Sequence, residues 1–319
     1  EMLDEGTVVP RLHKDEPIYI VEYGAGCGRL AFYLLRAFEE LSSTYRFLKR
    51  MKIVYVMTDF TMANVQFWRD HDMLQPYFQD GRLDCALADA TEPFNDLELL
   101  VSGVRLTEGS VVNPMICVCN YFMCITPADA FLVDRAGTLT EGLVTSRSER
   151  EDEDLTDETI ISRIRKTFTQ TPVDPATRYP APDHPALNLV LQEYHELLRD
   201  KGYPTSFLMP VGATRCVEGL VRLCRGHDCV LTLCGDKGYT QLAELEGRVG
   251  YPMSVEGSFS FMANMDGIGR YFSARGGSVM HNPVKVEAQG DTCLSVGLYL
   301  TTGQLASLPH CSTAFSEEL

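Results

Sequence analysis

The chain has 319 residues, of which 45% are hydrophobic and 23% are charged, as expected for a globular protein. Its 28 basic and 44 acidic side chains give a formal net charge of −16, which disfavours binding to the phosphate backbone of a nucleic acid. No apolar run of about 18 residues occurs, so we predict no transmembrane helix and no membrane partner. The length allows one large α/β domain with an insertion, or two modest domains.

The first predicted unit is a strand, a glycine-rich turn and a helix between Pro17 and Leu41. Its strand formers, Ile18–Val21, end at Glu22, and glycine then occupies every second position: Gly24, Gly26 and Gly28, with Ala25 inside the turn. A dinucleotide site requires G-x-G-x-x-G, whereas here the third glycine comes one residue early. The pattern acid-x-G-x-G-x-G instead resembles the S-adenosylmethionine (SAM) loop of class I methyltransferases. The alternative is a tight turn that binds no ligand.

Two further acids follow predicted strands. Asp59 follows Lys52–Met57, where a Rossmann-like site places a carboxylate on ribose hydroxyls. Its alternative role is to cap the helix predicted from Thr61 to Arg69. Asp89 ends the short strand predicted within Arg82–Ala90, where the resemblance implies an acid on the adenine amino group; the alternative is a cap or turn aspartate.

A fourth predicted strand, Val111–Cys119, is apolar on both faces and therefore central. Asn120 and Tyr121 follow it and are our first candidates for contact with the reacting methyl group, although a packing role is an alternative. An aromatic face such as that of Tyr121 suits the positive charge of a sulfonium. The predicted cofactor site comprises Glu22, Gly24, Ala25, Gly26, Gly28, Asp59, Phe60, Asp89, Ala90 and Asn120.

Residues 134–226 lie outside the predicted sheet, and we expect them to form a helical insertion that covers the ligand and shapes a substrate cleft. This part contains an acid-rich segment, Glu149–Glu158, for which we predict a solvated loop or a docking surface for a basic partner. A proline-rich stretch, Thr171–Pro185, precedes two predicted helices, Ala186–Asp200 and Gly212–Arg225.

The sheet resumes at Cys229–Leu233, and the loop after this strand supplies Asp236 and Tyr239 as further catalytic candidates. Strands at Val284–Val286 and Cys293–Leu300 are predicted to close the sheet as a hairpin. The predicted organisation is a SAM-binding half (1–133), a capping insertion (134–226), a C-terminal half of the Rossmann-like domain (227–302) and a tail (303–319).

The eleven cysteines form no C-x-x-C pair and no Cys/His spacing suited to zinc, so we predict no metal site. Most lie in apolar runs, which indicates buried, reduced thiols and a reducing compartment such as the cytoplasm.

Three blocks together resemble the MidA-like methyltransferases, a group that includes a mitochondrial assembly factor of respiratory complex I. They are VEYGAGCGRLAFYLLRAF, ICVCNYFMCITPADAF and VLTLCGDKGY…GSFSFMANMDGIGRYFSARGG. The resemblance implies a seven-stranded Rossmann-like sheet, SAM as methyl donor, a protein arginine as acceptor and the mitochondrial matrix as a second possible location. Tyr121 stands where the family has glutamate, which removes an obvious base or guanidinium partner.

We therefore predict a SAM-dependent methyltransferase with a protein side chain as its acceptor. A base for the acceptor is predicted among Tyr121, Asp129, Asp236 and Tyr239. One alternative is a non-catalytic SAM-fold assembly or scaffold protein that acts through its acidic insertion. The other, a nicotinamide-dependent oxidoreductase, is disfavoured by the early third glycine.

Overall fold

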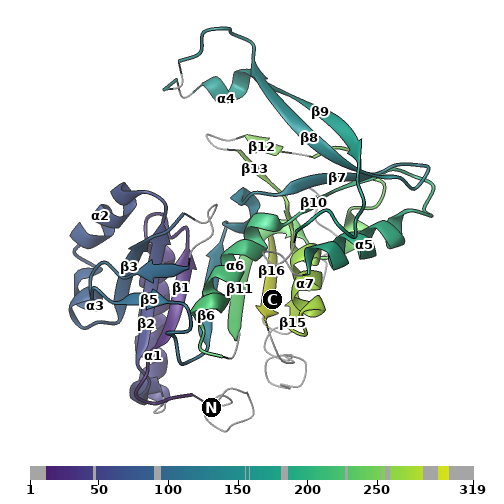
Figure 1. Ribbon diagram of the computed structural model, residues 1–319. Coiled ribbons are helices and arrows are strands. Elements are labelled where there is room, and N and C mark those ends of the chain that lie inside the picture. Colours follow the sequence, from purple (N-terminus) through teal and green to yellow (C-terminus); the bar gives the residue numbers. More distant parts are fainter. Residues whose placement is uncertain are drawn as a thin grey trace.

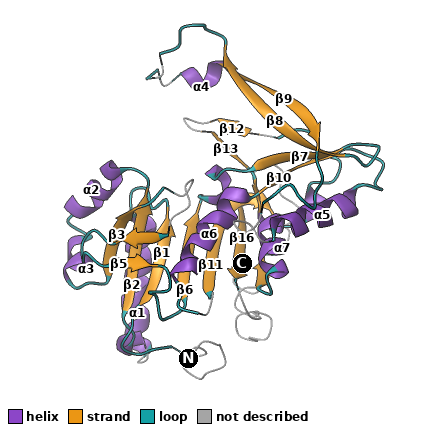
Figure 2. Ribbon diagram, viewed as in Figure 1, coloured by secondary structure: helices purple, strands orange, loops and turns teal. Residues whose placement is uncertain are grey.

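The computed structural model describes residues 12–45, 48–89, 95–154, 156–157, 159–180, 186–226, 229–251, 253–255, 259–282 and 294–301. These residues form a large sheet with helices on both faces and a smaller antiparallel sheet beyond the carboxyl ends of its parallel strands (Figures 1 and 2). No helix in these ranges combines the length and the apolar character that a membrane span requires.

Eight strands form the large sheet: β1 (Ile18–Tyr23), β2 (Ile53–Asp59), β3 (Leu83–Leu87), β6 (Met115–Asn120), β11 (Val230–Tyr239), β14 (Ala263–Asn264), β15 (Ser278–His281) and β16 (Leu294–Leu300). Seven of them follow the order β15-β16-β11-β6-β1-β2-β3, and β14 pairs with β11 outside this path. Only β16 runs antiparallel to its neighbours, β11 and β15. The sheet is therefore mostly parallel.

The strand order reverses at β1. From β1 the chain moves outward to β2 and β3, and β6 then pairs with the opposite side of β1. Such a topological switch point opens a crevice beyond the carboxyl ends of the two central strands, and ligands of open α/β sheets bind there. This arrangement confirms the predicted Rossmann-like class I fold with seven main strands.

The helices build two hydrophobic clusters, one on each face of the sheet. One cluster includes residues of α1 (Arg29–Thr44), α2 (Met62–Asp70) and α3 (Gln75–Gln79), and the other includes residues of α5 (Leu187–Leu198), α6 (Val211–Leu223) and α7 (Met265–Ala274). Successive strand residues alternate between them, so Ile20 packs with α1 whereas Val21 belongs to the α6 side. Glu22 consequently shares the α1 face with Ile20.

The insertion differs from the helical segment that we predicted for residues 134–226. Its main element is an antiparallel sheet with the order β10-β7-β8-β9, built from β7 (Asp129–Val133), β8 (Leu139–Ser148), β9 (Ile164–Pro172) and β10 (Thr205–Met209). Threonine recurs along β8 and β9, and β-branched residues favour strands. Pro172, the last residue of β9, is tolerated because β9 is an edge strand.

The boundaries of the insertion also differ from the prediction. The separate sheet already begins at Asp129, and α6 packs on β6 and β11 of the central sheet. The acid-rich segment and a one-turn helix, α4 (Ile160–Arg163), form the link at the outer end of the β8–β9 hairpin (Figure 1).

The remaining elements are short. They are the hairpins β4 (Asp96–Glu98) with β5 (Arg105–Thr107) and β12 (Met253–Val255) with β13 (Phe259–Phe261), and 3-10 turns at Leu48–Arg50, Met123–Ile125 and Leu242–Glu244. The predicted strand Val284–Val286 lies outside the described residues, and the partner that the structure gives to β16 is β15.

Candidate functional site

Three left-handed glycines lie directly after β1. Gly24, Gly26 and Gly28 have φ angles of 63°, 53° and 74°, which residues with a Cβ adopt at a cost of about 1–2 kcal/mol. A Cβ on Gly24 would come within 2.9 Å of the Phe122 ring, and one on Gly28 would lie 3.2 Å from the Met57 sulfur. At Gly26 the nearest atom would be 3.9 Å away. Packing therefore requires the outer two glycines, whereas the middle one borders open space.

Hydrogen bonds from β2 and α2 fix the shape of this loop. The indole Nε1 of Trp68, which is fully buried, donates to the carbonyl of Gly26 at 2.7 Å. The amide of Ala25 donates to the carbonyl of Thr58 at 3.0 Å, and the Thr58 hydroxyl donates to the carbonyl of Glu22 at 2.8 Å. The backbone around Gly26 is thus held in place before any ligand arrives, which lowers the entropic cost of binding.

Glu22 is a buried acid at the end of β1. Its side chain is only 3% exposed, and the Tyr55 hydroxyl on β2 donates to its Oε2 at 3.0 Å. Burial raises the pKa of Glu22 to about 7, and the hydrogen bond from Tyr55 opposes this effect only in part. A cation placed beside this carboxyl group would favour its ionised form.

Asp59 lies at the end of β2, on the same face. Its Oδ1 accepts from the Thr61 amide at 3.0 Å, and its Oδ2 accepts from the Asn64 side-chain amide at 2.8 Å. The N-cap of α2 is Thr61, so Asp59 does not take the capping role that we gave as its alternative, although its hydrogen bonds support the start of that helix. A carboxylate offers about four acceptor positions, so its oxygens retain capacity for ribose hydroxyls. Phe60 follows it with 70% of its surface exposed.

Asp89 belongs to the loop beyond β3. Its side chain is exposed, and it lies close enough to Cys216 on α6 for its charge to contribute to the raised pKa of that buried thiol. Ala90 lies outside the described residues. Since β3 ends at Leu87, Asp89 lies two residues past the end of its strand and not at the end, where we predicted it.

Asn120, Tyr121 and Phe122 follow β6 on the other side of the switch point. Asn120 is exposed, and the Tyr121 side chain is 55% exposed. Tyr121 has a φ of 52° and is the one non-glycine residue in the described ranges with a left-handed backbone. Its amide donates to the Gly235 carbonyl at 2.8 Å, which holds the turn in this conformation. Strain of this kind beside a ligand crevice is typical of functional sites.

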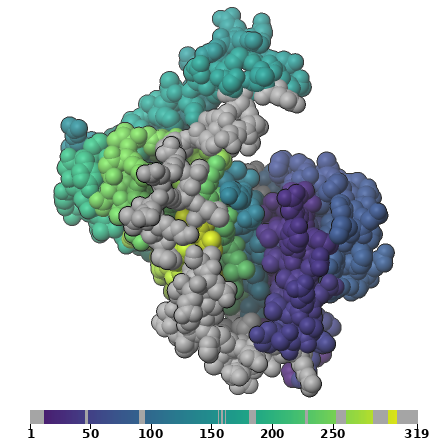
Figure 3. Space-filling model, turned by 180° about the vertical axis from the view of Figure 1, so that it is seen from behind, coloured from purple at the N-terminus to yellow at the C-terminus, as the bar shows by residue number. Residues whose placement is uncertain are grey.

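Phe122 closes the α6 side of the same crevice. Its ring stacks on Tyr23 with centroids 5.3 Å apart, and the Tyr23 hydroxyl donates to the Cys216 carbonyl at 3.0 Å. Figure 3 shows the molecule from behind, with a hollow between the N-terminal half, in purple and blue, and the outer part of the insertion, in teal.

Asp236 and Tyr239 do not fit the catalytic roles that we predicted for them. Asp236 is 0% exposed, and its carboxylate accepts from the backbone amides of Cys124 at 2.9 Å and Lys237 at 2.8 Å. It therefore anchors the turn after β6. The Tyr239 hydroxyl is buried and accepts from Arg248 Nη1 at 3.2 Å. Sequence reasoning placed both in an exposed loop, whereas β11 continues through them.

Tyr55, Trp68 and Phe122 shape the loop and were missed in the sequence. They lie on three separate elements, and no spacing in the chain connects them. Of the nine described cysteines, all are free thiols and eight are buried, as predicted. The exception is Cys27, which is exposed in the glycine loop.

No protein-family model and no curated protein sequence matches the chain. Three solved structures are similar to it at low identity. An uncharacterized ACR superfamily protein from Burkholderia thailandensis is 13% identical, with 92% of this chain and 77% of that chain covered and a TM-score of 0.46. The CMeT domain of a citrinin polyketide synthase is also 13% identical, with 93% and 50% covered and a TM-score of 0.38. A SAM-dependent methyltransferase from Methanosarcina mazei is 8% identical, with 90% and 93% covered and a TM-score of 0.37.

Proposed function

We propose that the protein is a SAM-dependent methyltransferase whose cofactor site is the crevice between β1 and β6. The observation that carries this proposal is the loop of three left-handed glycines at the switch point, with open space beside Gly26. The acids Glu22, Asp59 and Asp89 around it suit a cationic nucleoside with free ribose hydroxyls and would repel the pyrophosphate of a dinucleotide.

Each residue has a distinct role in this proposal. The backbone at Gly26 approaches the amino-acid part of the cofactor, Glu22 offers its carboxylate to the positive charge, and Asp59 accepts from the ribose. Phe60 and Asp89 hold the adenine, where an exposed aromatic ring such as that of Phe60 suits stacking.

The bound cofactor would supply a methyl group that is already activated on a sulfonium. The protein's own residues then contribute alignment and exclusion of water rather than strong chemistry. Asn120 and Tyr121, on the opposite side of the crevice, are our choice for holding the acceptor. The resemblance to MidA-like methyltransferases supports a protein side chain as that acceptor and the mitochondrial matrix as a location, whereas the buried free thiols support the cytoplasm.

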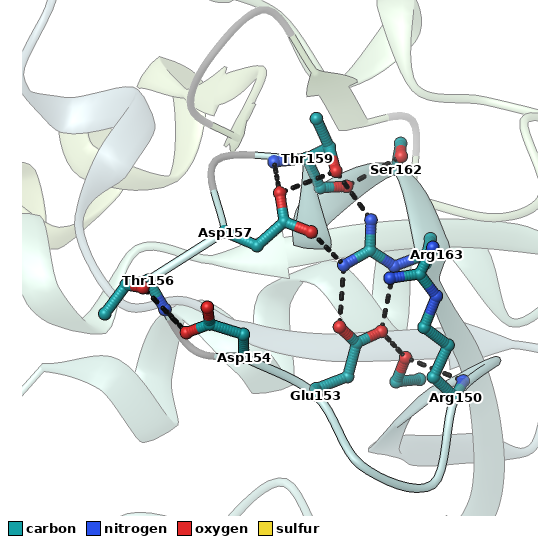
Figure 4. Close-up of polar contacts among 9 residues, drawn as sticks. Arg150, Glu153, Asp154, Thr156, Asp157, Thr159, Ser162 and Arg163 are labelled. Atoms are coloured by element: carbon teal, nitrogen blue, oxygen red, sulfur yellow. Dashed lines mark hydrogen bonds and ion pairs between the residues drawn. The ribbon is translucent and has the colours of Figure 1, made fainter.

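The acidic segment gives less support to the scaffold alternative than the sequence indicated. Arg163 donates to Glu153 through Nε at 2.9 Å and Nη2 at 2.6 Å, and its Nη2 also donates to Asp157 at 2.8 Å (Figure 4). The hydrogen bonds from Arg163 and Ser148 lower the pKa of Glu153 to about 2, and those from Thr159 and Arg163 lower the pKa of Asp157 to about 2. Glu153 and Asp157 therefore hold the hairpin tip together through Arg163, which leaves less of the segment's negative charge for a partner.

Transfer of label from tritiated SAM to a cell lysate tests the proposal. Label should accumulate with the purified protein and be absent with a Gly26→Leu variant. Label on macromolecules would identify a protein acceptor, and label on small molecules would exclude one. Tight binding of SAM and S-adenosylhomocysteine without any methyl transfer would contradict the enzyme proposal and favour the scaffold alternative.

A further inference from the structure

The insertion contains a cavity of about 490 Å³ that is separate from the glycine loop. The β8–β9 hairpin forms one wall, and Tyr251 and Phe261 contribute to the other. Pockets of about 300–1,000 Å³ with largely apolar walls are typical of small-molecule sites. The volume therefore suits a compact organic ligand.

One face of the β8–β9 hairpin supplies apolar side chains to this cavity. Val144 pairs with Phe168 and Ser146 pairs with Lys166, so all four side chains point to the same side of the hairpin. Val144 and Phe168 are both exposed, although they line a concave surface. The Phe168 ring lies 5.0 Å from the Tyr251 ring, measured between centroids. An aromatic ligand would cover this exposed apolar surface.

A polar atom inside the cavity points to the same conclusion. The Tyr251 hydroxyl is buried, and Ser206 and Gln170 lie near enough to influence its pKa through hydrogen bonding, yet no hydrogen bond of good geometry reaches it within the described part of the chain. A buried hydroxyl without a well-placed partner is unfavourable, so an acceptor that completes its hydrogen bonding would be favoured here. Gly142 faces it, and a Cβ there would lie 3.4 Å from the hydroxyl. A ligand oxygen beside Gly142 would accept this hydrogen bond.

The charges around the cavity are nearly balanced. Arg178 pairs with Glu141 and with Asp129, and its Nη2 lies 3.4 Å from the Asp129 Oδ2. The negative charge of Asp129, one of our candidate bases, is therefore already balanced by Arg178. Lys166 is the cationic lining residue, with its Nζ 5.9 Å from the centroid of Phe261. These charges suit a neutral or singly negative ligand and disfavour a cationic one.

We propose that this cavity is a second binding site, for a small aromatic molecule that carries a carbonyl or carboxylate oxygen. The ring packs between Val144, Phe168 and Tyr251, and the oxygen accepts from the Tyr251 hydroxyl. The site does not rest on the methyl-transfer proposal, because none of its lining residues belongs to the glycine loop.

Calorimetric titration with 2-naphthoate and 2-naphthamide tests this site. Both probes share the ring and the oxygen, and only the first carries a charge. Ser146→Trp, which fills the cavity, should weaken binding at least tenfold, whereas Thr145→Trp on the opposite face of the same strand should leave it unchanged. Tyr251→Phe should weaken both probes about two- to tenfold, and Lys166→Met should weaken the naphthoate alone if its charge is recognised.

Two results would overturn the site. One is the absence of heat from both probes at millimolar concentration with a wild-type protein that folds cooperatively. The other is equal binding by the Ser146→Trp and Thr145→Trp variants, which would place the probes elsewhere on the molecule.

Discussion

Replacing Glu22 with glutamine should change how stability depends on pH. Burial raises the pKa of Glu22 from 4.5 to about 7 in the folded protein. The folded state therefore holds the proton more tightly than the unfolded state between these values. The contribution of Glu22 to stability should be greatest below pH 4.5, fall as the pH rises to 7, and stay low above it. Glutamine cannot ionise, and its carbonyl can still accept from Tyr55.

The size of this effect follows from the two pKa values. At about 1.4 kcal/mol for each pH unit, the whole difference amounts to about 3 kcal/mol. The sequence pI is 4.8, so measurements are best kept above pH 5.5 to preserve solubility. About 2 kcal/mol of the loss falls between pH 5.5 and pH 8.

Urea denaturation of both proteins at pH 5.5 and pH 8 measures this effect. The stability of Glu22→Gln relative to wild type should increase by about 2 kcal/mol from the lower to the higher pH. Constant packing differences cancel in this comparison. The exposed Glu98, changed to glutamine, is the matched control and should show no such increase. If the stability of the Glu22 variant relative to wild type is also unchanged between the two pH values, the inferred burial of an ionisable acid at the end of β1 is refuted.

Three further predictions concern the loop, the hairpin tip and the strained turn. Trp68→Phe leaves the Gly26 carbonyl without its hydrogen-bond donor. It should lower the free energy of unfolding by about 1–3 kcal/mol in urea denaturation and weaken SAM binding. Unchanged SAM affinity would contradict the role of this hydrogen bond. Arg163→Met should speed hydrogen exchange across the hairpin tip at pH 7. Wild type should show the same loosening as the pH falls from about 4.5 to 2, because the Glu153 carboxylate, whose pKa is lowered, becomes protonated in this range and its stabilising contribution is lost. Tyr121→Gly should raise the free energy of unfolding by about 1 kcal/mol, because glycine adopts a left-handed backbone without strain. The same change should reduce methyl transfer. A loss of stability would show that the turn is unstrained.

Most of the central sheet was predictable because its inner parallel strands are apolar on both faces, whereas the short strands β14 and β15 were not predicted. Ile18–Tyr23 ends two residues later than predicted, and Met115–Asn120 begins four residues later and ends one residue later than predicted. The glycine loop lies where the spacing placed it. Glu22 and Asp59 could be placed at strand ends from their position alone. The burial and hydrogen bonds of these two acids could not be predicted, since they depend on Tyr55 and on the start of α2.

Other features escaped prediction for identifiable physical reasons. The strands of the insertion carry polar residues and threonines without a continuous apolar face, so periodicity alone gave too weak a signal for β8 and β9. The left-handed turn at Tyr121 is set by a hydrogen bond to Gly235, more than a hundred residues away in the chain. Asp236 reads as a loop residue next to glycines, yet β11 carries it into the protein interior.

The most direct test of the central claim is calorimetric titration of SAM into three proteins: wild type, Gly26→Leu and Gly81→Leu. Gly26 and Gly81 both have a left-handed backbone, with φ angles of 53° and 77°, and neither would meet a neighbouring atom closer than 3.9 Å. Gly81 precedes β3, at the opposite end of the sheet from the crevice. The account predicts that SAM binds wild type and Gly81→Leu alike and that Gly26→Leu loses binding. Equal affinity for all three proteins, or binding of NADH in place of SAM, would contradict it.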